Sequence, residues 1–169
     1  GDGAGSKGQA AFLAGLDAFR DAGLLHEFEA GKREYIGRHA RTPVLLVQGP
    51  PGTGKSYCTA FAVFARLQGA IKEKRSYRVF LSCKTHAATD VLMKNVLEVQ
   101  EKLRALRAAN PKLFGKYFDV RLLDVPLFRV APHDPPPPGV VHLCKDADKE
   151  KGEEHNADAI AESEWAVAA

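Results

Sequence analysis

The segment from Gly49 to Ser56 reads Gly-Pro-Pro-Gly-Thr-Gly-Lys-Ser and constrains the fold of this chain more than any other stretch. It matches the pattern G-x-x-x-x-G-K-[ST], in which glycines let successive backbone N–H groups turn inward around an anion. An apolar run, Val44 to Val47, precedes the pattern, and a long apolar segment follows it. A strand, a phosphate-binding loop and a helix in this order predict an α/β unit with a parallel sheet.

This loop predicts ATP and Mg²⁺ as cofactors, because its residue types suit a nucleotide's phosphates and metal. Lys55 is the expected catalytic residue, since its charge reaches the β- and γ-phosphates, and the Ser56 hydroxyl is the expected Mg²⁺ ligand. The expected cofactor-binding residues are Gly49, Pro50, Pro51, Gly52, Thr53, Gly54, Lys55 and Ser56. The alternative is a glycine-rich turn that holds no ligand.

Apolar spacing predicts the helices and strands around the loop. Residues 6–25 place Phe12, Leu13, Leu16 and Phe19 on one helical face, and residues 26–39 predict a second, more polar helix. Further helices are expected at 56–67, ended by Gln68-Gly69, at 86–108 and at 156–164. Strands are expected at 44–47, 77–81, 118–123, 140–143 and from Trp165 onward.

The charge of the chain is unevenly distributed. Residues 145–169 contain three Lys and eight Asp or Glu, whereas the residues before them contain 21 Lys or Arg against 13 Asp or Glu. A basic region of this kind suits an anionic partner such as nucleic acid, although a solvated surface would have the same composition. With no apolar run of about 18 residues and only three cysteines, we expect a cytoplasmic protein with no membrane partner.

Two segments of this sequence resemble motifs of a known family. Val47 to Ser56, with Gln48 before the loop, resembles motif I of superfamily 1 helicases of the up-frameshift/senataxin-like branch. Ser82 to Leu92 resembles motif Ia of that branch, with Ala88, Asp90 and Leu92 in register. Thr85 stands where the family has Ser, His86 where it has Asn, and Lys84 replaces a Pro.

The resemblance implies that Thr85 and His86 contact the backbone of single-stranded nucleic acid, DNA or RNA. Lys84 adds a charge beside them that suits a phosphate. The alternative for this loop is structural, with Thr85 or Thr89 capping the helix that follows. The family also has an upstream Gln that reads adenine, and Gln9 is the candidate here.

The resemblance further implies a P-loop NTPase RecA-like parallel sheet with flanking helices, incomplete in these 169 residues. We divide the chain into an N-terminal helical segment (1–40), a P-loop RecA-like core (41–125) and an irregular Pro-rich, charged insertion with a truncated C-terminal end (126–169). The chain is thus expected to be part of an ATP-dependent helicase or translocase that is inactive alone. Its expected partners include the remaining helicase domains of the parent chain.

An acidic residue for Mg²⁺ is missing from the sequence pattern. The helicase family has an Asp-Glu pair after four apolar residues, and no such pair occurs here. Asp124 follows too short an apolar run and Asp146 follows polar residues, so both are expected to be surface carboxylates. Two other functions remain open from the residues: an AAA+ type ATPase, which shares the Gly-Pro-Pro-Gly-Thr-Gly-Lys string, and a non-catalytic nucleotide-binding module.

Overall fold

The computed structural model describes residues 4–26, 30–41, 55–130, 136–143 and 158–169. Its helices are α1 (Ala4–Asp21), α2 (Ala30–Arg41), α3 (Lys55–Lys72), α4 (His86–Ala109) and α5 (Pro111–Tyr117), with a 3₁₀ helix, η1, at Val120–Asp124. Its strands are β1 (Tyr77–Phe80), β2 (Leu127–Val130), β3 (Val141–Leu143) and β4 (Trp165–Ala168). The strand expected at 44–47 lies outside the described residues.

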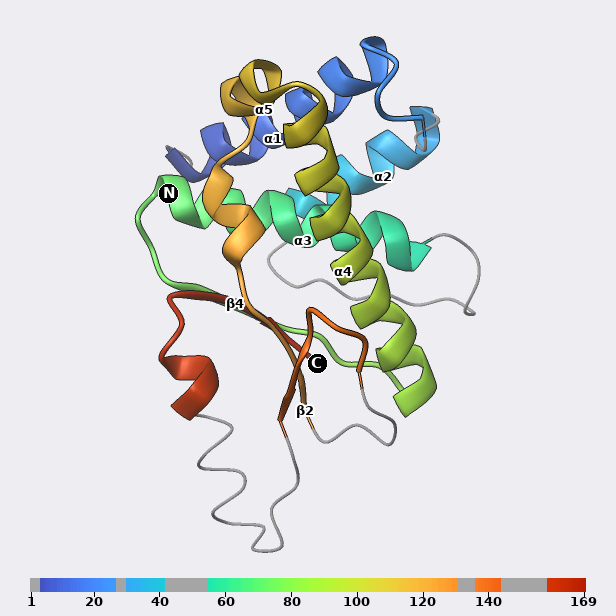
Figure 1. Ribbon diagram of the computed structural model, residues 1–169, viewed down its shortest axis with the longest axis vertical. Coiled ribbons are helices and arrows are strands. Elements are labelled where there is room, and N and C mark those ends of the chain that lie inside the picture. The colour runs from blue at the N-terminus through green and yellow to red at the C-terminus, as the bar shows by residue number, and fades with distance from the viewer. Residues whose placement is uncertain (1–3, 27–29, 42–54, 131–135, 144–157) are drawn as a thin grey trace, which may run out of the picture.

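The four strands form one parallel sheet in the order β1-β4-β2-β3 (Figure 1). β4 is the last strand in sequence but lies inside the sheet, where Val167 pairs with Val79 of β1 and Leu127 of β2. Of the four strands in the described part of the chain, three (β2, β3 and β4) come from the segment after residue 125. The all-parallel pairing and the flanking helices confirm the α/β fold that the sequence predicts.

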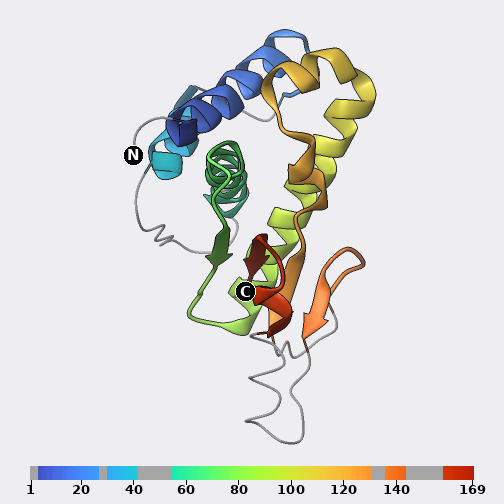
Figure 2. The ribbon, with the colours of Figure 1, turned by 90° about the vertical axis from the view of Figure 1, so that its left-hand side faces the viewer.

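The helices form layers beside this sheet. α3 and α4 pack against each other, and α1 and α2 lie across α3 from the sheet (Figures 1 and 2). The apolar faces predicted for α1 and α4 are buried: Phe12, Leu13, Leu16 and Phe19 on α1, and Leu92, Val96, Val99, Leu103 and Leu106 on α4. In the described part of the chain, no helix is both long and apolar enough to span a bilayer.

The strand predicted at 118–123 is wrong, because the backbone there forms the 3₁₀ helix η1. Asp119 starts η1: its carboxylate accepts the backbone N–H of Arg121 at 2.9 Å. The residue before it, Phe118, packs its ring 5.1 Å from Phe12 and 5.1 Å from Phe114, centroid to centroid. An aromatic anchor and a capping carboxylate therefore outweigh the apolar run that suggested a strand.

The predicted end of α3 at Gln68-Gly69 is also wrong, since the helix continues to Lys72. The Gln68 side chain is buried, donates to the carbonyl oxygens of Gly8 and Tyr117 at 2.9 Å each, and accepts the Asp119 N–H at 2.9 Å. α1 crosses so closely here that a Cβ at Gly8 would lie 2.9 Å from the Gln68 carbonyl oxygen. Packing therefore keeps the helix intact through Gly69, a residue that on its own disfavours helix.

α1 ends earlier than its predicted limit of residue 25. Gly23 has φ +74, and the N–H groups of Gly23 and Leu24 donate back to the carbonyls of Arg20 and Phe19. This arrangement is a Schellman end, which needs a residue that adopts positive φ without strain. α2 then starts at Ala30 rather than residue 26, and within the described part of the helix predicted at 156–164, residues 158–161 are helical.

Candidate functional site

The predicted phosphate loop leads directly into α3. Residues 49–54 lie outside the described residues, as do the side chains of Lys55 and Ser56, but α3 begins at Lys55. The expectation that the loop opens a helix is thus confirmed. The first N–H groups of a helix have no partner within it and, together with the helix dipole, favour an anion. Residues 58–71 of α3 are all buried, so the helix that follows the loop is firmly anchored.

A second candidate site lies where β1 leads into α4, at the carboxyl edge of the sheet. Lys84, Thr85 and His86 are all exposed there, so the structure brings the three predicted nucleic-acid residues together at one helix start. The Thr85 hydroxyl oxygen accepts the Ala88 N–H at 3.0 Å, and the Thr89 hydroxyl donates to the Thr85 carbonyl at 3.0 Å. Thr85 therefore caps α4, as the structural alternative required. A capping hydroxyl still has a proton to donate to a ligand.

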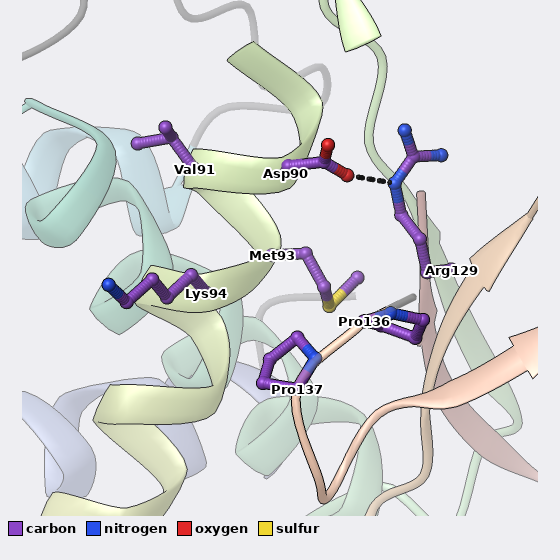
Figure 3. Close-up of a pocket in the computed structure, with 7 residues that line it drawn as sticks. All are labelled: Asp90, Val91, Met93, Lys94, Arg129, Pro136 and Pro137. Carbon is purple, nitrogen blue, oxygen red and sulfur yellow. Dashed lines mark hydrogen bonds and ion pairs between the residues drawn. The ribbon is translucent and has the colours of Figure 1, made fainter. Parts of the chain in front are cut away.

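Arg129 of β2 ties this helix start to the sheet, and the sequence analysis did not single it out. Its side chain is only 4 % exposed, and its Nε donates to Asp90 Oδ1 at 2.8 Å (Figure 3). Its Nη1 donates to the carbonyl oxygens of Val130 and Ala169, at 2.8 and 3.3 Å. One guanidinium thus joins α4 to the carboxyl ends of β2 and β4. The signal was available: one Arg inside the apolar run Leu-Phe-Arg-Val implies a buried cation with a partner.

Arg129 also contacts His86, one of the predicted nucleic-acid residues. The distance from Arg129 Nη2 to His86 Nδ1 is 3.4 Å. A guanidinium has only donors, so a hydrogen bond between the two side chains needs a His86 Nδ1 that accepts. Two contacts therefore position these residues. Thr85 is held by its capping bond to the Ala88 N–H, and His86 lies against Arg129 of the sheet.

Gln9 lies near the carboxyl end of α3, far from the start of that helix at Lys55. It is half-buried on α1, next to Gly8, whose close neighbours Gln68 and Gly69 belong to the last turns of α3. Thirteen residues of helix, about 20 Å at 1.5 Å each, separate that end of α3 from Lys55. Gln9 is therefore not beside Lys55, and the other residues expected to hold ATP before Lys55 lie outside the described part of the chain.

Of the two carboxylates considered for Mg²⁺, only Asp124 belongs to the described part of the chain. Asp124 is exposed and precedes β2, so it lies at the amino end of that strand, whereas α4 starts from the carboxyl side of β1. Asp146 lies outside the described residues. Among those that are described, no three His, Cys, Asp or Glu side chains converge as metal ligands.

Comparison with known proteins adds a family to this geometry. A family model described as an AAA domain, AAA_11, matches residues 28–127, more than half of the chain. The matched range contains the phosphate loop, α3, and the β1–α4 corner with its three exposed polar residues. No curated protein and no solved structure matches the chain.

Proposed function

Since this chain belongs to the AAA domain family, whose members are P-loop ATPase domains of helicase type, we propose that it is the ATP-binding part of a nucleic-acid translocase. The parent enzyme would be a superfamily 1 helicase of the up-frameshift/senataxin-like branch, and this chain its first RecA-like motor domain. One observation carries the nucleic-acid half of the proposal: exposed Lys84, Thr85 and His86 lie together at the start of α4, beside the carboxyl edge of a parallel sheet.

ATP and Mg²⁺ fit the start of α3. The loop from Gly49 to Gly54 would wrap the phosphates with backbone N–H groups, Lys55 would neutralise the β- and γ-phosphate charge, and Ser56 would hold Mg²⁺. Bound Mg²⁺ would screen the charge of the phosphate oxygens. The buried body of α3, residues 58–71, supports this assignment, because it anchors the helix whose first turn would face the phosphates.

The start of α4 would hold the phosphates of a single strand. The exposed Lys84 ammonium supplies charge, and the Thr85 hydroxyl and His86 ring supply hydrogen-bond donors. Arg129 keeps this helix start in register with β2 and β4. A strand bound in this way would sit on the same sheet edge as the nucleotide, which is the arrangement that a motor needs to link ATP to movement.

We expect the 169-residue chain to bind ATP but not to hydrolyse it at a useful rate. Hydrolysis needs an acid that holds Mg²⁺ and a group that orients water, and no Asp-Glu pair follows an apolar run in this sequence. Single-turnover hydrolysis of labelled ATP tests this expectation, with Lys55→Ala as the background control. Hydrolysis that depended on Lys55 would contradict it.

The nucleic-acid proposal is tested by fluorescence anisotropy of the 169-residue chain with a labelled single-stranded oligonucleotide at several salt concentrations. The double change Thr85→Ala/His86→Ala should weaken binding by about tenfold, the cost of one or two phosphate contacts. Lys84→Ala should also reduce the salt dependence by about 0.7 in the log–log slope, because one ionic phosphate contact is lost.

Lys112→Ala is the matched control for Lys84→Ala. Both lysines are exposed, but Lys112 is on α5, beyond the far end of α4, so its loss should leave affinity and salt slope unchanged. If the double change left binding intact, the motif Ia assignment would be wrong. If Lys112→Ala and Lys84→Ala weakened binding equally, the interaction would be a general response to positive charge.

A further inference from the structure

An open pocket lies beside the Thr85–His86 corner, between the first half of α4 and the turn that leads into β3. Its volume is about 430 Å³, within the range of small-molecule pockets, about 300–1,000 Å³. Four α4 residues, Arg129 of β2 and two prolines, Pro136 and Pro137, line it (Figure 3). Asp90 on its wall is five residues after Thr85, about 7.5 Å along the helix.

The pocket has apolar walls and one polar end. Met93 lies between the Asp90–Arg129 ion pair and the two proline rings (Figure 3). A thioether and the apolar faces of two pyrrolidine rings offer surface that is poor in hydrogen-bonding groups. The polar end is the ion pair itself, in which Arg129 fixes one oxygen of an Asp90 side chain that is still 41 % exposed. A planar ligand with apolar faces and a hydrogen-bonding edge matches this division.

We propose that this pocket receives one nucleobase of the single strand whose phosphates bind at Lys84, Thr85 and His86. The inference rests on the proposed function and adds a base-reading subsite to it. A nucleobase has the required chemistry, because its faces stack on apolar surface while its edge donates or accepts hydrogen bonds. Lys94, which is exposed on the rim and points away from the ion pair, suits the phosphate of that nucleotide (Figure 3).

The Asp90 carboxylate gives the subsite a base preference. An ionised carboxylate only accepts hydrogen bonds, so it selects a base edge that carries an amino group. Cytosine presents its N4 amino group in this way and is the base most often read by Asp or Glu, whereas thymine and uracil offer carbonyl oxygens. Two facing acceptors repel, so the pocket favours cytosine over thymine.

The test compares two homopolymers of equal length, oligodeoxycytidylate and oligothymidylate, binding to the 169-residue chain at one salt concentration. The cytidylate should bind about tenfold more tightly, the discrimination expected for one good base contact. Val91→Trp places a large ring at the mouth of the pocket, since Val91 is 40 % exposed and lines it. This variant should lower the ratio of the two affinities to about one.

Val120→Trp is the matched control, because Val120 is a similarly exposed valine on η1, away from the pocket. It should leave both affinities and their ratio unchanged. Asp90→Asn, which gives the edge a donor as well as an acceptor, should also bring the ratio close to one, and circular dichroism confirms that each variant is folded.

Two failures have different meanings. Equal affinity for the two homopolymers, with binding still lost in Thr85→Ala/His86→Ala, would overturn the base subsite and leave the proposed function standing. No salt-sensitive binding of either homopolymer would overturn both. A tenfold preference that survived Val91→Trp would also overturn this inference, because the base would then be read elsewhere.

Discussion

Gln68 and Arg129 are two buried polar side chains that each join three parts of the chain, but they lie in different regions. Gln68, in the helical layer, connects α3 to α1 and to the segment between α5 and η1 through three hydrogen bonds to backbone groups. Arg129, at the carboxyl edge of the sheet, connects β2 to β4 and to α4. Both act as junctions, and they differ in charge and in the exposure of their partners.

This difference separates architecture from function. Gln68 is neutral, and its three hydrogen-bond partners are all backbone groups, so it satisfies buried polar atoms and nothing more. Arg129 carries a charge whose side-chain partners, Asp90 and His86, reach a surface where ligands bind in α/β sheets. A change at Gln68 should therefore affect stability alone, whereas a change at Arg129 should affect stability and binding together.

The largest effect is expected for Gln68→Leu. The substitution keeps the volume but leaves the Tyr117 carbonyl oxygen and the Asp119 N–H without this partner, and it removes a second contact from the Gly8 carbonyl oxygen, which lies inside α1. At about 1–3 kcal/mol for each unsatisfied group, the free energy of unfolding should fall by about 4 kcal/mol. Urea denaturation monitored by circular dichroism measures the loss, and oligonucleotide affinity at a temperature where the variant is folded should not change.

Gln9→Leu is the matched control, since Gln9 is half-buried on the neighbouring helix α1. Its effect on the free energy of unfolding should stay below about 1 kcal/mol. A Gln68→Leu variant as stable as Gln9→Leu would mean that the three backbone groups find other partners. A loss of oligonucleotide binding in folded Gln68→Leu would break the separation between the two regions.

A smaller loss of stability, accompanied by a loss of binding, is expected for Arg129→Met. Removing one partner of a buried ion pair costs about 3–5 kcal/mol, but Asp90 is partly exposed and water can solvate it. We therefore expect a loss of about 2 kcal/mol in the free energy of unfolding. Oligonucleotide affinity should also fall several-fold, because α4 loses its link to the sheet.

Arg129→Lys distinguishes charge from geometry at the same position. Lysine keeps the charge but lacks the planar fork that reaches Asp90, two carbonyls and His86 at once. If the geometry of the guanidinium matters, Lys should keep the positive charge at this position without restoring the affinity for the oligonucleotide. Full recovery of affinity by Lys would show that Arg129 acts only through its charge.

The sequence predicts the parts of this fold that depend on local pattern. The spacing of Phe12, Leu13, Leu16 and Phe19 predicts the buried face of α1, and the Thr85–Leu92 segment predicts a helix start with exposed polar residues, because both follow from neighbours along the chain. The Gly49–Ser56 pattern likewise predicts that a helix follows it.

The rest depends on contacts between distant residues. Gly69 suggests the end of a helix when the local sequence is considered alone. α3 continues through it, and there Gly8 of α1, sixty residues before Gln68, packs closely against α3. Likewise β2 contains Arg129, a poor residue for a buried strand until Asp90 and the end of β4 neutralise it. Nothing local to Leu127–Val130 specifies those partners, so the pattern indicates a buried cation but not the junction that it forms.

The last effect is a loss of stability at acid pH. It tests whether the charge of Asp119, whose N–H donates to Gln68, serves stability alone. Burial raises the pKa of Asp119, but hydrogen bonds and charge from Arg121, helped by Lys72, outweigh it and lower that pKa from 3.8 to about 2. A carboxyl whose folded pKa is depressed stabilises the protein above its unfolded pKa, so stability should fall by about 2 kcal/mol as pH drops from about 4.5 to 2. Asp119→Asn should remove that part of the pH dependence in urea denaturation, whereas Asp124→Asn, on the same 3₁₀ helix, should not. If the free energy of unfolding depended on pH in the same way for the wild type and Asp119→Asn, the acid sensitivity would arise elsewhere. A change in the oligonucleotide affinity of Asp119→Asn at pH 7 would show that this charge acts beyond the helical layer.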